Sequence, residues 1–152
     1  MSEKNEILLI EDDAADVELA LHALRENKLV NHIQVLRDGE EALEYLFSPL
    51  GAARLASGRT PKLILLDLKL PKVDGIEVLR RVKSDPLTKF IPVVILTSSK
   101  EERDLVRSYD LGVNSYIQKP VDFDQFRKLV IQVGLYWLVT NQPAPSHAPV
   151  AV

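Results

Sequence analysis

Five short apolar runs alternate with segments of helical period along most of this chain. The runs lie at residues 6–10, 32–36, 62–66, 92–96 and 115–118. Strands that are apolar throughout and are separated by helices are typical of a parallel sheet covered on both faces. The alternation therefore predicts an α/β fold, in which helices on both faces cover a doubly wound, five-stranded parallel sheet.

Capping and turn residues place a helix after each strand. Asp13 is expected to cap the first helix, and Asp85-Pro86 to follow the third. The fourth helix is expected over residues 101–111, with Gly112 at its C-terminal cap. The last helix is expected to bury an apolar stripe formed by Phe123, Phe126, Val130, Val133 and Trp137.

Composition indicates one folded domain. The chain has 152 residues, of which 46% are hydrophobic and 27% charged, and these values are ordinary for a soluble domain. We assign the domain to residues 1–141. Residues 48–61 form a long insertion for such a fold, because they are interrupted by two prolines and two glycines. Residues 142–152 are rich in proline and alanine, and we expect them to be disordered.

Charge, cysteine content and hydropathy exclude several classes of function. The formal net charge of -3, with scattered basic residues, gives no general attraction to nucleic acid. Without cysteine there can be no disulfide, thiolate nucleophile or cysteine-ligated zinc. The longest apolar run, residues 133–139, is shorter than the roughly 20 residues of a membrane span, and no secretory signal precedes the first strand. We expect a cytoplasmic protein that binds neither nucleic acid nor membrane.

Acidic, hydroxyl and basic residues stand at the carboxyl ends of the expected strands. Glu11 and Asp12 follow the first strand, Asp67 the third, Thr97 the fourth and Lys119 the fifth. In an open parallel sheet these ends meet at one edge, where ligands bind. Each residue alone has a plainer explanation, such as helix capping or a loop charge. Their joint occurrence at successive strand ends is not explained in that way and predicts a functional site.

The acids predict a site for a divalent metal. Two like charges about 4 Å apart repel by about 4 kcal/mol at an effective dielectric of about 20, so crowded carboxylates require a cation. Magnesium suits them because it prefers oxygen ligands and keeps part of its water. We expect Asp12 and Asp67 to bind Mg2+ directly, Glu11 to reach it through water, and the main-chain carbonyl of Lys69 to complete the set.

Asp67 is the candidate nucleophile of this site. A carboxylate can attack phosphorus and form an acyl phosphate once a metal neutralises the incoming group. Lys119 would then contact one phosphate oxygen, and the Thr97 hydroxyl would donate a hydrogen bond to another. The three histidines have no metal-ligand spacing, and the chain has no glycine-rich phosphate loop.

The motifs around these residues resemble those of bacterial two-component response-regulator receiver domains. The segments ILLIEDD, LILLDLKLPKVDG, IPVVILTSS and SYIQKP occur in the family's order, and the likeness spans residues 6–139. The resemblance implies a flavodoxin-like fold with strand order 2-1-3-4-5. It also implies roles for the matching residues, namely the phosphoacceptor Asp67, the metal-binding acids Glu11 and Asp12, the phosphate-sensing Thr97, the phosphate-binding Lys119, the switch residue Tyr116 and a cis peptide bond before Pro120.

A narrower resemblance is to the small receivers that partner phytochrome-type histidine kinases. It rests on the 48–61 insertion, the KSDP segment and the YWL sequence near the end. It implies a single-domain response regulator, not an enzyme, that takes a phosphoryl group from such a kinase. It also implies a homodimer through the C-terminal helix and extension, where residues 134–139 are apolar on every side.

Three alternatives share parts of this pattern. A metal-dependent phosphohydrolase would also form an aspartyl phosphate, but such enzymes carry a second acid where Lys69 stands. A flavin or nucleotide binder of the same fold would want a phosphate-cradling loop after the first strand, where this chain has acids. A degenerate receiver used only for docking would not need the full set of Asp12, Asp67, Thr97 and Lys119.

Overall fold

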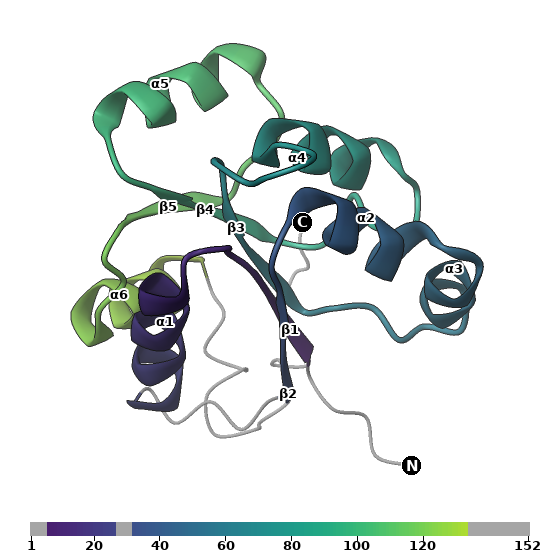
Figure 1. The fold of residues 1–152 in the computed structure, drawn as a ribbon, viewed down its shortest axis with the longest axis horizontal. Coiled ribbons are helices and arrows are strands. Elements are labelled where there is room, and N and C mark those ends of the chain that lie inside the picture. Colours follow the sequence, from purple (N-terminus) through teal and green to yellow (C-terminus); the bar gives the residue numbers. More distant parts are fainter. Residues whose placement is uncertain (1–5, 27–31, 134–152) are drawn as a thin grey trace.

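Five parallel strands form one sheet at the centre of the molecule (Figure 1). The computed structural model describes residues 6–26 and 32–133. The strand order β2-β1-β3-β4-β5 confirms the predicted topology. The strands are β1 (Glu6–Ile10), β2 (His32–Leu36), β3 (Leu63–Asp67), β4 (Val93–Thr97) and β5 (Ser115–Gln118).

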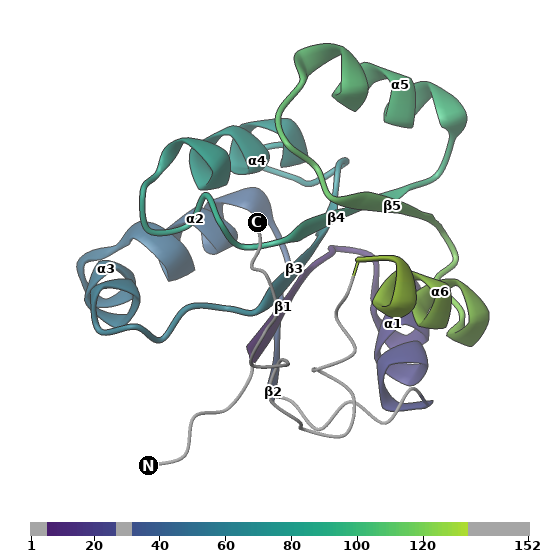
Figure 2. The same cartoon turned by 180° about the vertical axis from the view of Figure 1, so that it is seen from behind.

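Helices cover both faces of the sheet, as the sequence predicts (Figures 1 and 2). Because side chains alternate along a strand, Ile7 and Leu9 pack toward one set of helices, and Leu8 and Ile10 toward the other. All four residues are fully buried. On the first face lie α1 (Ala14–Glu26) and α6 (Phe123–Val133), and on the second lie α2 (Gly39–Phe47), α4 (Gly75–Ser84) and α5 (Lys100–Tyr109).

Two strands lie one residue further along the chain than expected. β3 was expected over 62–66 and β4 over 92–96, but they end at Asp67 and Thr97. Pro92 has no N–H for the ladder and serves only as an acceptor, through its carbonyl, for the Ile64 N–H at 3.0 Å. The shift makes Asp67 and Thr97 the last residues of paired strands, so both are held by the sheet rather than by a loop.

The insertion at residues 48–61, which the sequence predicts only as a long connection, contains a helix. This helix, α3 (Pro49–Ala56), begins directly after α2. Ser48 separates the two helices, because its side chain accepts a hydrogen bond from the Gly51 N–H at 3.1 Å, and Pro49 suits the first position of a helix. The Arg54 guanidinium ties α3 back to the Tyr45 carbonyl at 2.7 Å. The insertion is thus a packed element of the domain.

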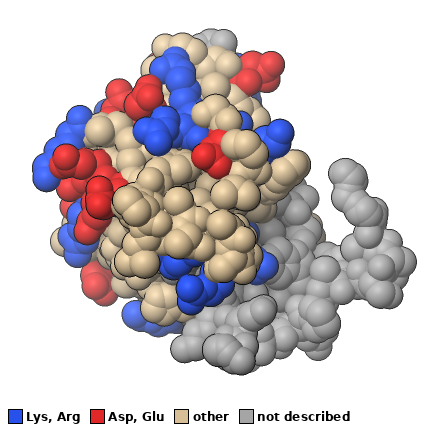
Figure 3. Space-filling view, turned by 90° about the vertical axis from the view of Figure 1, so that its right-hand side faces the viewer, with Lys and Arg blue, Asp and Glu red and all other residues tan. Residues whose placement is uncertain are grey.

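The outer side of α3 carries few charges. The side of the molecule where α3 lies shows an uncharged area bordered by basic and acidic residues (Figure 3). Leu50 is 69% exposed on this helix. Its exposed neighbours are small or rigid residues, namely Pro49, Ala52, Ala53 and Ala56.

The C-terminal end of α5 and the buried residues of α6 differ from the sequence expectation. α5 ends at Tyr109, two residues early, and Asp110 takes the left-handed cap position expected at Gly112, with φ of 50°. Aspartate tolerates this conformation because its short polar side chain can bond locally. In α6 the buried residues include Phe126 and Leu129, whereas Phe123 is 36% exposed at the helix start.

Several expectations about the C-terminal end lie outside the described residues. These are the position of Trp137, the apolar run at residues 134–139 and the disorder of residues 142–152. Across residues 6–26 and 32–133, none of the helices is both long enough and apolar enough to cross a membrane.

Candidate functional site

The sheet brings the predicted site residues to one edge. Glu11 directly follows β1, and its N–H donates to the Leu36 carbonyl of β2 at 3.0 Å. Lys119 directly follows β5, and its N–H donates to the Thr97 carbonyl of β4 at 2.7 Å. Asp67 is the last residue of β3, between β1 and β4. Backbone hydrogen bonds therefore fix the starting points of these side chains.

Three carboxylates converge at this edge. Oxygen atoms of Glu11, Asp12 and Asp67 lie within 4.8 Å of one another. Glu11 is fully buried and Asp67 is 3% exposed, whereas Asp12 faces solvent. A set of oxygen donors with an open side fits a hard divalent cation that retains some water. The predicted metal-binding acids are thus together in space.

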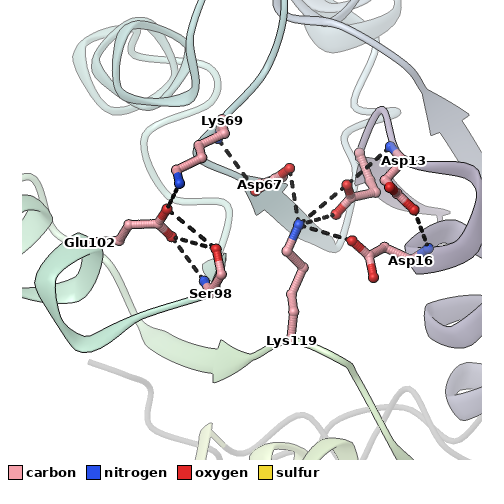
Figure 4. A network of polar contacts seen from close by, with 8 residues as sticks. Asp13, Asp16, Asp67, Lys69, Ser98, Glu102 and Lys119 are labelled. Carbon is pink, nitrogen blue, oxygen red and sulfur yellow. Dashed lines mark hydrogen bonds and ion pairs between the residues drawn. The ribbon is translucent and has the colours of Figure 1, made fainter.

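The Lys119 ammonium lies between the carboxylates of Asp67 and Asp16 (Figure 4). Its Nζ is 3.3 Å from Glu11 Oε1, 3.3 Å from Asp67 Oδ2 and 3.1 Å from Asp16 Oδ2. The lysine side chain is only 13% exposed. Lys119 is therefore a cation of the protein itself that relieves part of the repulsion among these carboxylates.

Burial and charge shift the ionisation of the site. Burial, and then the neighbouring Asp67 charge, raise the pKa of Glu11 from 4.5 to about 7, although Lys119 acts against the shift. Burial also raises the pKa of Asp67, with Lys119 again lowering it in part. Burial favours a lower pKa for Lys119, but Asp67 and Glu11 outweigh burial and raise it. The lysine therefore stays charged at neutral pH, while Glu11 and Asp67 resist full ionisation without a further cation.

A second polar network lies on the other side of Asp67 (Figure 4). The Lys69 N–H donates to Asp67 Oδ1 at 3.4 Å. The Lys69 side chain reaches α5, where its Nζ is 3.0 Å from Glu102 Oε2. Glu102 also accepts a hydrogen bond from the Ser98 N–H at 2.9 Å. The loops after β3 and β4 are thereby joined through α5.

The two predicted switch residues lie on neighbouring strands, Thr97 at the end of β4 and Tyr116 within β5. Thr97 is 1% exposed. Tyr116 on β5 is partly buried, and the Arg107 guanidinium carbon of α5 lies 5.3 Å from the centre of its ring. The peptide bond between Lys119 and Pro120 is cis, as the resemblance implied. The switching roles of Thr97 and Tyr116, and the ligand role of the Lys69 carbonyl, stay predictions.

Sequence reasoning missed two participants, namely Asp16 and Glu102. Asp16 lies in the first turn of α1, three residues after the cap Asp13, whose side chain accepts its N–H at 3.0 Å. Helical period alone could have placed it near the acids after β1. The spacing of Ser99 and Glu102 fits a helix-start motif, but the sequence does not show that Glu102 also meets a lysine from another loop.

Comparison with known proteins gives the family. The sequence profile described as "Response regulator receiver domain" matches residues 7–131. The chain therefore belongs to the response regulator receiver family. Such a domain is a phosphoacceptor signalling module of two-component systems rather than a conventional enzyme.

Similar proteins include several response regulators, one of which is linked by name to a bacteriophytochrome. The chain is 51% identical to the bacteriophytochrome response regulator AtBRR, with a TM-score of 0.80 over 93% of this chain and 100% of that one. It is 40% identical over 134 residues to response regulator Rcp1 of Synechocystis sp., which covers 88% of this chain and 89% of Rcp1. The Mn2+-bound structure of Rcp1 is 38% identical and has a TM-score of 0.67 over 93% of this chain and 99% of that one.

A relative named for another process is about as similar in sequence as Rcp1 is. The probable methanogenesis regulatory protein FilR2 of Methanothrix harundinacea is 42% identical over 141 residues, or 92% of this chain and 88% of that protein. The names of these relatives therefore mention different processes, a bacteriophytochrome response and methanogenesis.

Proposed function

We propose that this protein accepts a phosphoryl group from a phosphohistidine of a sensor histidine kinase onto Asp67. The observation that carries the proposal is the nearly buried Asp67 carboxylate, 3.3 Å from the Lys119 ammonium and beside two further acids. A carboxylate oxygen of Asp67 forms a bond to phosphorus while the P–N bond to the imidazole breaks. The electron pair of that bond stays on the imidazole nitrogen, and the acyl phosphate remains on Asp67.

The chain's own residues would stabilise the transferred group. Lys119 supplies a positive charge that is already within reach of Asp67, and it is expected to move onto a phosphate oxygen. Thr97 is expected to donate its hydroxyl hydrogen bond to another oxygen. Lys119 also pairs with Glu11 and Asp16, which keep the ammonium in place before the phosphoryl group arrives.

Mg2+ is the proposed cofactor. Asp12, Asp67, Glu11 and the Lys69 carbonyl would hold it, and the oxygen-only donor set of the three acids supports this choice. When bound, the ion neutralises charge on the incoming phosphoryl group. The Mn2+-bound form of Rcp1 supports a divalent metal in a related receiver.

The proposed phosphodonor is a phytochrome-type kinase. The support comes from relatives whose names link them to bacteriophytochrome or cyanobacterial phytochrome, at 41% to 51% identity. A cytoplasmic location is part of the proposal. A homodimer through the C-terminal helix and extension stays part of the proposal and is testable by light scattering of the parent and of a variant with polar residues at Trp137 and Leu138.

Phosphorylation is proposed to act as a population shift. The added charge would draw Thr97 toward Asp67 and let Tyr116 change its packing against α5. The surface formed by α5, β5 and α6 would then differ between the two states. A phosphohydrolase is disfavoured because the second residue after Asp67 is Lys69, and a docking-only role is disfavoured by the complete set of charged site residues.

Intact-mass spectrometry tests the assignment directly. Incubation with acetyl phosphate and Mg2+ is expected to add one phosphoryl group to the parent and none to Asp67→Asn. Asp104→Asn, a change of the same kind at an exposed position of α5, is the matched control and should label like the parent. Labelling of Asp67→Asn at the parental level would refute the role of Asp67.

A further inference from the structure

Two lysines flank the Asp67 carboxylate, and their ammonium groups have different partners (Figure 4). Lys119 Nζ lies 3.3 Å from Asp67 Oδ2. The Lys69 N–H donates to Asp67 Oδ1 at 3.4 Å, but Lys69 Nζ lies 3.0 Å from Glu102 Oε2. Lys69 therefore belongs to the phosphoacceptor loop through its backbone and to α5 through its side chain.

The Glu102 carboxylate joins three segments of the chain. Besides Lys69, it binds the Ser98 N–H at 2.9 Å and the Ser98 Oγ at 3.4 Å. The Glu102 side chain is 12% exposed, whereas that of Lys69 is 75% exposed. Burial acts to raise the pKa of Glu102, but hydrogen bonds from Ser98 and the pairing with Lys69 outweigh burial and lower it. Glu102 is therefore a charged group at neutral pH with donors on two sides.

Ser98 connects this carboxylate to the phosphorylation site. It directly follows Thr97, whose carbonyl accepts the Lys119 N–H at 2.7 Å. The hydrogen bond from Ser98 to Glu102 therefore also restrains the end of β4, which carries the buried Thr97 hydroxyl. A phosphoryl group carries a charge of about -1.5 to -2 at neutral pH. On Asp67 it would compete with Glu102 for the Lys69 ammonium and attract Thr97.

We propose that Glu102 is a positioning residue that favours the unphosphorylated state. Its contacts hold the Lys69 side chain and Ser98 against α5 and away from the phosphorylation site. This inference rests on the proposed phosphorylation of Asp67. Phosphorylation draws both Lys69 and Thr97 toward Asp67, so the contacts of Glu102 break. Their loss is part of the free energy required for switching, and it releases the first turn of α5.

Substitution can separate this role from helix capping. Ser99 Oγ accepts the Glu102 N–H at 3.2 Å, and this backbone contact does not depend on the Glu102 side chain. Glu102→Gln keeps a carbonyl oxygen for Ser98 but removes the charge that pairs with Lys69. Glu101→Gln is the matched control, since it removes the same charge from the neighbouring, exposed position of the same helix turn.

The test measures the phosphorylation rate of the full chain at limiting acetyl phosphate with Mg2+. Glu102→Gln is expected to raise the rate roughly two- to fivefold, which corresponds to the loss of one ion pair whose lysine is largely exposed. Glu101→Gln should leave the rate unchanged. In a Lys69→Gln background, Glu102→Gln should have little further effect, and a purely structural role would not depend on Lys69 in this way. If Glu102→Gln does not fold, Glu102→Asp, which shortens the reach to Lys69, should raise the rate in the same direction.

The outcomes distinguish the inference from the function on which it rests. If the parent is phosphorylated but Glu102→Gln and Glu101→Gln react at equal rates, the role of Glu102 is overturned and the proposed function is not. The same holds if the Ser98 amide resonance does not shift on phosphorylation, because release of Glu102 must change its hydrogen bond. A parent that takes up no phosphoryl group would refute the proposed function, and the inference with it.

Discussion

The Lys119 ammonium and the Asp67 carboxylate form a nearly buried ion pair, with 3.3 Å between Nζ and Oδ2. The two side chains are 13% and 4% exposed. Since Glu11 and Asp16 share the same ammonium, one lysine partly neutralises three carboxylates. The acidic site is therefore held together by a cation of the protein itself, and this lysine should affect stability as well as signalling.

Lys119→Met is expected to lower the free energy of unfolding by about 3 kcal/mol in metal-free buffer, because it leaves buried carboxylates without their partner. Excess Mg2+ should restore part of the loss, since a bound metal relieves the same repulsion. Urea unfolding with EDTA and with Mg2+ measures both effects. Lys72→Met is the control, because Lys72 is 60% exposed in its pairs with Asp38 and Glu40 and should cost less than about 1 kcal/mol. Losses of equal size in the two variants would contradict the ion-pair argument.

Glu11 should make the metal-free protein less stable as pH rises. Its pKa is raised from 4.5 to about 7, so the folded state binds the proton more tightly than the unfolded state. This contribution is complete below pH 4.5 and is lost as pH rises through about 7. Unfolding free energies in EDTA at several pH values should fall more steeply for the parent than for Glu11→Gln. Mg2+ should flatten the parental slope, because metal binding favours the ionised carboxylate. Identical slopes for parent and variant in EDTA would disprove the assignment.

Much of the fold follows from local sequence signals. Apolar runs identified β1, β3 and β4, shorter apolar stretches identified β2 and β5, and Asp13 and Asp85 marked helix ends correctly. The strand ends were off by one residue at Asp67 and Thr97, because pairing partners set those ends and a single run does not reveal them. The sequence does not predict α3, because proline and glycine favour loops unless a cap such as Ser48 places them in a helix.

Only those site residues that lie at the ends of strands could be predicted from the sequence. Topology brings Glu11, Asp67 and Lys119 together, so their proximity followed from the order of the strands. The pairing of Lys69 with Glu102 depends instead on the side-chain directions of two loops and on the placement of α5. Neither is encoded in spacing along the chain, and so only the structure could reveal the second network.

Gly39 should be intolerant of any side chain. The Gly39 N–H donates to the Pro71 carbonyl at 3.3 Å, and a Cβ at Gly39 would lie 1.7 Å from the Val73 carbonyl oxygen. Gly39→Ala is therefore expected to displace the loop after Asp67, to cost about 3 kcal/mol of stability and to slow phosphorylation. Chemical unfolding and the acetyl phosphate assay measure these effects. Gly58→Ala is the control, since its φ of 88° costs about 1 kcal/mol but no atom lies within 4 Å. Normal phosphorylation of a stable Gly39→Ala protein would rule out the close contact.

The packing of α3 can be tested by comparing two leucines of the same helix. Leu55 is 5% exposed and faces the domain, whereas Leu50 is 69% exposed. Leu55→Ala should lower the free energy of unfolding by about 3 kcal/mol, because it removes buried methyl groups and leaves a cavity. Leu50→Ala should change it by less than about 0.5 kcal/mol, as is usual for a surface substitution. Urea unfolding of both variants measures the difference. Small and equal effects would mean that residues 48–61 are a loose connection, as the sequence alone suggested, and not a packed helix.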